Sequence, residues 1–393
     1  GKDYFKNKAC YIDSFFSLTM PQKLTEGPIA DRIARIGDQF AISGEFLYGE
    51  ELCNGHINTT YRACYRTEDG TEERYILQRI NDYVFKDPVM VMKNVEKVTR
   101  HIRWKTIRHR RNTAGQPLTL YPARGGRNYI DLPEEGGMWR CYNNIEGTHT
   151  YDVVENTRQA YQAGYAFGSF QELISDMNPE DLKESIPNFH NTLSRLEQLD
   201  TAAADDKMGR KASVAAELAF VDAHREEAGK IVKMMESGDI PERITHNDTK
   251  INNVMVDDAT NEGVAVIDLD TVMPGCALYD FGDMVRTSTA AAAEDEKDLS
   301  KVFSRKEYFE ALVKGYLSEA KFLTEAEKEN LAFSGRLITF TIGIRFLADY
   351  LAGDTYFRTA YADHNLVRCR TQFKMVESME EQQDEYEAIV RGN

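Results

Sequence analysis

The segment ITHNDTKINNVMV (244–256) holds residue types and a spacing that suit the transfer of a phosphoryl group. Asp248 is followed five residues later by Asn253, and Asp268 ends the next apolar stretch. Such a transfer needs a carboxylate that orients and deprotonates the accepting hydroxyl, oxygen ligands for a metal ion, and a cation near the migrating group. We therefore predict catalytic roles for Asp248, as the base, and Lys250, and we predict Asn253, Asp268 and Asp270 as metal ligands.

The metal predicted from these residues is Mg²⁺, because amide and carboxylate oxygens with retained waters suit a hard octahedral ion. The spacing matches the catalytic loop of protein kinases and the aspartate that follows it. In the alternative interpretation, His246 and Asp248 cap a turn, and Asp268 and Asp270 only decorate the end of a strand. The combination of loop, lysine, asparagine and a second aspartate favours the catalytic interpretation.

Two kinds of secondary structure must position these residues. Upstream, two β-rich runs at 56–66 and 74–78 flank an EDGT turn and predict a hairpin, and short strands are predicted within 129–142. Downstream, strands are predicted at 253–256 and 264–269. Helical periodicity is seen in the ranges 89–104, 157–174, 186–199, 212–235, 308–319 and 336–352.

These patterns predict an α+β protein with a bilobal, protein-kinase-like fold. We expect a small β-rich N-terminal lobe at 1–140 that binds nucleotide and a hinge at 141–150. A larger, mainly helical C-terminal lobe at 151–393 would carry the catalytic residues and the binding site of the substrate. A chain of 393 residues with 42% apolar content can bury cores of this size.

Composition excludes several classes of partner. The chain has 48 Lys and Arg against 64 Asp and Glu, and the resulting net charge of −16 repels a nucleic-acid backbone. The basic run at 97–111 is more typical of a solvated helix face than of a nucleic-acid or membrane site. Six scattered cysteines and the absence of a long apolar run predict reduced thiols, no membrane association and a cytoplasmic location.

The chain resembles the aminoglycoside phosphotransferase and choline kinase superfamily, and within it the bacterial N-acetylhexosamine 1-kinases. The strings that carry this resemblance are GHINTTY (55–61), YILQ (75–78), THNDTK (245–250), IDLDT (267–271), DFGD (280–283), EDEKDLSK (294–301), RFLADYL (345–351) and HNLVR (364–368). The resemblance implies an ATP- and Mg²⁺-dependent kinase that phosphorylates the anomeric hydroxyl of free N-acetylglucosamine or N-acetylgalactosamine.

The resemblance also implies further contacts. Besides Asp248 and Lys250, the sugar is expected to contact His56, Arg345 and Tyr356. The nucleotide, held between the lobes near residues 141–147, is expected to contact a set of residues in the N-terminal lobe: Gly55, Asn58, Thr59, Gln78 and Asn143.

Several alternatives stay open at this point. Gln78 stands where protein kinases carry the lysine of the third strand, so the usual phosphate clamp is missing. Arg345 lies on an apolar helix four residues before Asp349, so an ion pair between these two side chains is expected, either as a purely structural contact or to orient Arg345 toward the sugar. Other candidate functions are a kinase of an aminoglycoside, choline or homoserine, and a non-catalytic pseudokinase.

Overall fold

The structure is a computed structural model that describes residues 22–52, 58–108 and 117–393. It separates into two compact units. Of the described residues, unit 1 comprises 22–52, 58–103 and 117–146, and unit 2 comprises 104–108 and 147–393. The N-terminal region is built on a β-sheet and the C-terminal region is mainly helical, which confirms the predicted fold class.

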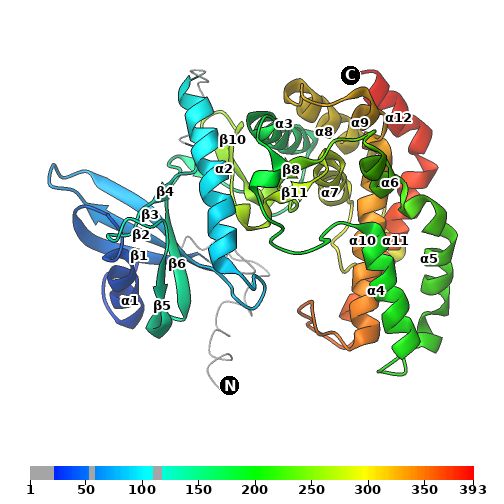
Figure 1. Cartoon of the computed structure of the whole chain (residues 1–393), viewed down its shortest axis with the longest axis horizontal. Coiled ribbons are helices and arrows are strands. Elements are labelled where there is room, and N and C mark those ends of the chain that lie inside the picture. The colour runs from blue at the N-terminus through cyan, green and yellow to red at the C-terminus, as the bar shows by residue number, and fades with distance from the viewer. Residues whose placement is uncertain (1–21, 53–57, 109–116) are drawn as a thin grey trace. The chain divides into compact units, whose positions relative to one another are not determined.

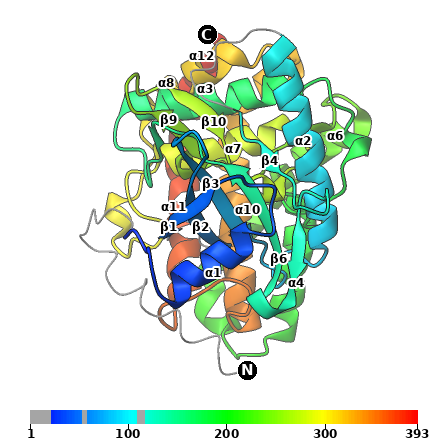
Figure 2. The same cartoon turned by 90° about the vertical axis from the view of Figure 1, so that its left-hand side faces the viewer.

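Unit 1 contains an antiparallel sheet in the order β1-β2-β3-β6-β4, with β5 also paired to β6. Tyr61, Ala63 and Tyr65 of β2 are buried in the core of this unit. Helix α1 packs on the strands, as Figure 2 shows. The elements that lie wholly or mostly in unit 1 are α1 (Pro28–Gly37), β1 (Glu45–Leu52), β2 (Thr59–Arg66), β3 (Glu72–Arg79), α2 (Pro88–Arg108), β4 (Leu120–Tyr121), β5 (Ile130–Leu132) and β6 (Gly137–Asn143).

The predicted hairpin is confirmed. β2 and β3 pair in register from Thr59 opposite Arg79 to Arg66 opposite Glu72. The turn between them is closed by a hydrogen bond from the backbone N–H of Thr67 to the carbonyl of Thr71. This local pairing follows from two β-rich runs and the Asp69-Gly70 turn between them, both of which are visible in the sequence.

Unit 2 consists mainly of helices (Figure 1). Helix α3 has the predicted limits, whereas the predicted helix at 212–235 is divided at Gly229, and the helix predicted to begin at 186 begins after the cap Asn191. The helices are α3 (Thr157–Ile174), α4 (Thr192–Asp205), α5 (Ala215–Ala228), α6 (Lys230–Ser237), α7 (Ala277–Thr289), α8 (Lys306–Glu319), α9 (Glu325–Glu329), α10 (Leu331–Ala352), α11 (His364–Glu381) and α12 (Gln383–Arg391).

Short strands in unit 2 frame the predicted catalytic segment. They form two small antiparallel sheets, β10-β9-β7 and β11-β8. The strand predicted to reach residue 269 ends earlier because Asp268 adopts a left-handed backbone conformation with φ 61°. Their limits are β7 (Thr148–His149), β8 (Arg243–Thr245), β9 (Val254–Asp257), β10 (Gly263–Val266) and β11 (Met273–Gly275).

Helix α10 forms the centre of the helical core and packs on α4, α7 and α11. Its most apolar 18 residues have a mean hydropathy of 1.4, so by length and composition alone this helix, and among the described residues no other, could cross a membrane. However, 83% of that stretch is buried inside the protein. The apolar composition of α10 is therefore accounted for by its central position.

Helices α3 and α8 approach each other closely through glycines. A Cβ atom added at Gly315 would lie 2.0 Å from the carbonyl oxygen of Tyr161, and one at Gly164 would lie 2.3 Å from that of Leu312. These contacts are with backbone atoms, which cannot rotate away as a side chain can. The distance between α3 and α8 is therefore set by the absence of side chains at these positions.

We predict that Gly315→Ala lowers the free energy of unfolding by about 3 kcal/mol, because α3 and α8 must separate to admit one methyl group. Urea denaturation followed by circular dichroism measures this loss. Gly125→Ala is the control, since nothing lies within 4 Å of its added Cβ atom. Equal stability of the two variants would show that the helices are not held together at Gly315.

Candidate active site

The catalytic segment, defined here as residues 246–253, connects β8 to β9. Within it, the Nζ atom of Lys250 lies 3.1 Å from Oδ1 of Asp248. Asn253 donates from Nδ2 to the backbone carbonyl of Asp248 at 2.8 Å and to its carboxylate at 3.2 Å. The structure thus brings together Asp248, Lys250 and Asn253.

The amide of Asn253 has a fixed orientation, because a carbonyl oxygen can only accept a hydrogen bond. Its Nδ2 atom faces Asp248, so its Oδ1 atom remains available to a metal ion. The backbone N–H of Ile267 donates to the carbonyl of Asn253 at 2.9 Å. Asp268 is the next residue after Ile267, so it lies close to Asn253 in space. An amide oxygen and a carboxylate at this position fit Mg²⁺ by their chemistry.

Asp270, the third predicted ligand, lies in the 3₁₀ turn Leu269–Thr271 that follows Asp268. It is 2% exposed, whereas Asp268 is half-buried. A metal ion that reached Asp270 would therefore have to lie inside the protein. Its role as a ligand stays a prediction.

A single buried carboxylate, that of Asp280 on α7, supports the start of the catalytic segment. It accepts hydrogen bonds from the backbone N–H groups of His246 at 2.8 Å and Asn247 at 2.7 Å, and from Nε2 of Gln171 at 2.7 Å. Burial raises the pKa of Asp280 to about 7, although these three donors favour the charged form. Asn247, with φ 66°, is held in the left-handed region by this support.

Asp283, one turn further along α7, supports the next part of the segment. Its carboxylate accepts the backbone N–H of Thr249 at 3.1 Å and pairs with Arg286 at 2.8 Å. Burial raises the pKa of Asp283, but the charge and hydrogen bond of Arg286, together with other nearby positive charge, outweigh this effect and hold the pKa below its usual value. Arg286 also pairs with Glu294, so the strings DFGD and EDEKDLSK meet here.

Two buried histidines contact the same segment. His246 donates from Nε2 to the carbonyl of Ile267 at 2.9 Å, and its Nδ1 atom accepts the backbone N–H of Asp248 at 3.2 Å. His190 donates from Nε2 to the carbonyl of Asn247 at 3.0 Å. Burial lowers the pKa of His246 and lowers that of His190 to about 4, so both rings are neutral at pH 7.

Arg345 is surrounded by aromatic rings, and among the described residues no ion pair joins it to Asp349. The centre of its guanidinium lies 4.9 Å from the ring of Phe189, 5.4 Å from Phe357 and 5.7 Å from Tyr356. Its Nη2 atom lies 3.5 Å from the hydroxyl of Tyr356. Because Phe189 packs against His190, this arrangement connects Arg345 to the catalytic segment.

The expected pair is wrong because Asp349 has other partners. Its carboxylate accepts the backbone N–H groups of Thr355, Tyr356 and Phe357 at 2.8–2.9 Å, and Nδ2 of Asn365 at 2.9 Å. Asp349 therefore fixes the turn after α10 that carries two of the rings around Arg345. It positions Arg345 indirectly, through Tyr356 and Phe357.

In unit 1, Gln78 is opposite Arg140 on the neighbouring strand. Arg140 is fully buried and donates to Oε1 of Gln78 from Nε at 3.0 Å and from Nη2 at 2.5 Å. Gln78 in turn donates from Nε2 to Oγ1 of Thr60 at 3.0 Å. A cation is therefore present beside the position of the missing lysine, on β6 instead of β3.

The other residues predicted to contact the nucleotide lie in unit 1. Thr59 begins β2, and Oδ1 of Asn58 accepts the backbone N–H of Asn81 at 2.9 Å. Asn143 ends β6, where its Oδ1 atom accepts the backbone N–H of Thr119 at 2.7 Å. Gly55 and His56 lie outside the described residues.

Sequence reasoning missed the residues that support the catalytic segment: Gln171, His190, Asp280, Asp283 and Arg286. DFGD was noted only as part of a resemblance. Its two carboxylates lie three residues apart on a helix with apolar neighbours, and buried carboxylates require donors. That signal pointed to a backbone-binding role for Asp280 and Asp283.

Comparison with known proteins agrees with this geometry. Residues 54–317 match the model of a phosphotransferase enzyme family. A microcompartment-associated aminopropanol kinase has 17% sequence identity and a TM-score of 0.53, over 91% of this chain and 98% of that one. An aminoglycoside phosphotransferase from Alicyclobacillus acidocaldarius has 12% identity and a TM-score of 0.57, over 93% and 97%. An ethanolamine kinase from Plasmodium vivax has 12% identity and a TM-score of 0.52, over 85% and 81%.

We predict that Asp280→Asn lowers the free energy of unfolding by about 3 kcal/mol at pH 8, where the native carboxylate is ionised. The amide supplies one acceptor oxygen, so its NH₂ group must face a backbone N–H or Gln171. Urea denaturation measures the change. Asp298→Asn is the control, because Asp298 is an exposed cap that accepts the N–H of Ser300, and asparagine caps equally well. Equal losses in both variants would contradict the supporting role of Asp280.

Proposed function

The chain belongs to the phosphotransferase enzyme family, and from that premise we propose that it transfers the γ-phosphoryl group of ATP to the anomeric hydroxyl of a free N-acetylhexosamine. The proposed catalytic activity rests on one observation: the Asp248 carboxylate lies between the Lys250 ammonium and Asn253, which is a predicted ligand of Mg²⁺. We place the reaction in the cytoplasm.

In the proposed mechanism, the Asp248 carboxylate accepts a hydrogen bond from the anomeric hydroxyl and removes its proton as the oxygen attacks phosphorus. An anomeric hydroxyl is more acidic than other sugar hydroxyls and suits a carboxylate base. Asn253, through Oδ1, and Asp268 would hold Mg²⁺, which when bound neutralises charge on the phosphate oxygens.

Lys250 supplies the cation of the catalytic segment. Desolvation opposes its charged form, but the nearby Asp248 carboxylate raises the pKa of Lys250 above its usual value, so the ammonium stays protonated. Its side chain is 39% exposed and can therefore reach a substrate. We propose that it attracts the transferred phosphoryl group while it holds Asp248 in place.

The sugar half of the proposal is supported by the surroundings of Arg345. A guanidinium offers several donors to sugar hydroxyls, and rings such as Tyr356, which is 57% exposed, can pack on the apolar face of a pyranose. Amino alcohols, the substrates named for two of the similar structures, carry a positive charge. Arg345 would repel such a group, which favours a neutral sugar over an amino alcohol.

One experiment tests both halves. The full chain is incubated with ATP, Mg²⁺ and, in turn, N-acetylglucosamine, N-acetylgalactosamine, glucose, ethanolamine, choline, homoserine and kanamycin. We expect ADP release with an N-acetylhexosamine, and a product whose phosphorus couples to the anomeric proton in ³¹P NMR. A sugar 6-phosphate would overturn the predicted position of attack. Turnover of ethanolamine, choline, homoserine or kanamycin instead would support the alternative kinase function.

We predict that Asp248→Asn lowers kcat by about 10²–10⁴-fold, because it removes the proton acceptor. ATP affinity should be retained, since the predicted metal ligands remain. The control is Asp257→Asn, at the end of β9, where an oxygen of the new amide can still accept the N–H groups of Ala259 and Thr260. Steady-state kinetics and nucleotide titration measure both quantities, and an Asp248→Asn enzyme with more than a tenth of the original kcat would exclude Asp248 as the base.

We predict that Arg345→Lys raises KM for the hexosamine about 10–100-fold, because hydrogen bonds from a charged donor contribute about 1.5–3 kcal/mol and lysine lacks the planar fork. KM for ATP should barely change. Arg336→Lys, on the same helix, is the control, because Arg336 pairs with Glu227 and Glu380 and should affect stability instead. A normal sugar KM together with a lower melting temperature in Arg345→Lys would remove Arg345 from the site.

A further inference from the structure

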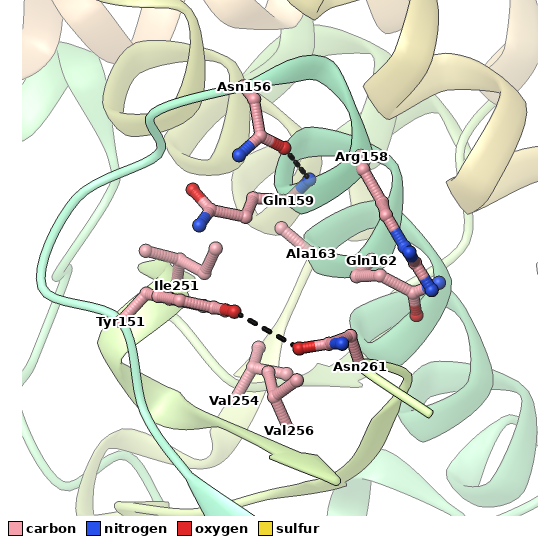
Figure 3. A pocket seen from close by; sticks show the side chains of 10 residues that line it. All are labelled: Tyr151, Asn156, Arg158, Gln159, Gln162, Ala163, Ile251, Val254, Val256 and Asn261. Atoms are coloured by element: carbon pink, nitrogen blue, oxygen red, sulfur yellow. Dashed lines mark hydrogen bonds between the residues drawn. The ribbon is translucent and has the colours of Figure 1, made fainter. Parts of the chain in front are cut away.

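Unit 2 contains a cavity of about 190 Å³ between the start of α3 and the hairpin formed by β9 and β10 (Figure 3). Its apolar lining consists of Ala163, Ile251, Val254 and Val256, which are at most 3% exposed. Its polar lining comes from α3, the loop before it, and the turn between the two strands. The cavity therefore has an apolar floor and a polar rim.

Three carboxamides at this rim have their orientations fixed by backbone groups. Oδ1 of Asn156 accepts the N–H of Gln159 at 3.0 Å, and Oε1 of Gln159 accepts the N–H of Glu155 at 2.7 Å. Oε1 of Gln162 accepts the N–H of Gly263 at 2.9 Å. Because a backbone N–H can only donate, each amide must present its NH₂ group elsewhere.

These NH₂ groups have no other hydrogen-bond partner within the part of the chain that the structure describes. Gln159 is the most telling, since it is 92% buried and lines the cavity. Figure 3 shows its amide nitrogen on the side of Ile251 and Tyr151. The nitrogen itself is accessible from the cavity, so water or a ligand there can supply the acceptor that the protein does not.

The remaining polar groups at the rim also offer mainly hydrogen-bond donors. Arg158 uses one nitrogen for the carbonyl of Thr260 at 2.8 Å, which leaves Nε and Nη1. The Tyr151 hydroxyl lies 3.5 Å from Oδ1 of Asn261, which leaves the Asn261 NH₂ group. Among the described residues that line the cavity none is acidic. The rim thus combines four carboxamide NH₂ groups with one guanidinium.

We propose that this cavity is a binding site for a small organic anion. A carboxylate or phosphate group would accept hydrogen bonds from Gln159, Gln162 and Arg158, and a short hydrocarbon part would cover the apolar floor. The start of α3 adds a favourable field for negative charge. The site is distinct from Asp248, but Ile251 belongs to the turn that carries Asn253, so a bound anion would contact the catalytic segment from its far side.

The test uses methyl NMR of the full chain, since Ala163, Ile251, Val254 and Val256 report on the cavity floor. Butyrate and butyl phosphate are titrated as anionic probes, and butylammonium as a cation of similar size. We expect saturable shifts of these methyl groups with at least one anion and none with butylammonium. The two anions distinguish a carboxylate site from a phosphate site. Equal shifts with butylammonium, or no shift with either anion, would overturn the proposal.

Two variants test the donors without removing the internal hydrogen bonds. Gln159→Glu and Gln162→Glu each keep an oxygen for the backbone N–H but replace the NH₂ donor with an anionic oxygen. We expect each to raise the dissociation constant of the anionic probe at least 10-fold. Gln162→Glu stands in if the more buried Gln159→Glu fails to fold.

The control is Gln198→Glu on α4, which adds the same charge outside this cavity and keeps an acceptor for Arg195. It should bind the probe as the unmodified chain does. Unchanged affinity in Gln162→Glu, or an equal loss in Gln198→Glu, would show that the amide donors do not form the site.

Discussion

The hydrogen bonds from the backbone of His246 and Asn247 to Asp280 determine the shape of the catalytic segment. The first residues of this segment belong to neither helix nor strand, yet they are mostly buried, so their N–H groups need partners that secondary structure does not supply. Asp280 supplies two acceptors and Asp283 a third, for Thr249. With these bonds in place, the chain turns through the left-handed Asn247 and directs Asp248 toward Lys250 and Asn253.

Helices α3 and α8 complete the hydrogen bonding of the Asp280 carboxylate and enclose it. Gln171 donates to Asp280 from α3 and is itself contacted by the hydroxyl of Tyr316 on α8. The glycine contacts between α3 and α8 bring these two side chains within reach of α7. A polar network that is satisfied in this way fixes one arrangement of the core, because every alternative leaves a buried group without a partner.

The sequence was sufficient where the determining contacts are local. Asp248, Lys250 and Asn253 lie within six residues, so their spacing alone predicted their meeting, and the β2–β3 hairpin follows from two β-rich runs and a short turn. Arg345 and Asp349 show the limit of that reasoning. Helical spacing makes them neighbours, but three backbone N–H groups at 355–357 compete for the same carboxylate. Such competition depends on how the chain folds back after α10, which no local pattern reveals.

The same limit applies to the position of the positive charge on the sheet of unit 1. The sequence shows that Gln78 replaces the lysine of the third strand, but only the register between β3 and β6 shows that Arg140 lies opposite it. Likewise, the role of Asp280 depends on a loop more than thirty residues earlier. Spacing along the chain therefore predicts which residues come together in the catalytic segment, whereas the residues that hold them in place come from distant elements.

The two neutral histidines, His190 and His246, make the stability of the catalytic segment depend on pH. Their pKa values are lowered in the folded protein, so the stability they contribute is fully present above about pH 6.5 and is lost as the pH falls toward their folded values. Asp280 acts in the opposite direction, because its pKa is raised to about 7 and its contribution falls as the pH rises from about 4. In mild acid, unfolding of the segment takes up protons at two imidazoles and releases one from a carboxyl group, and the balance between these three groups sets its tolerance of acid.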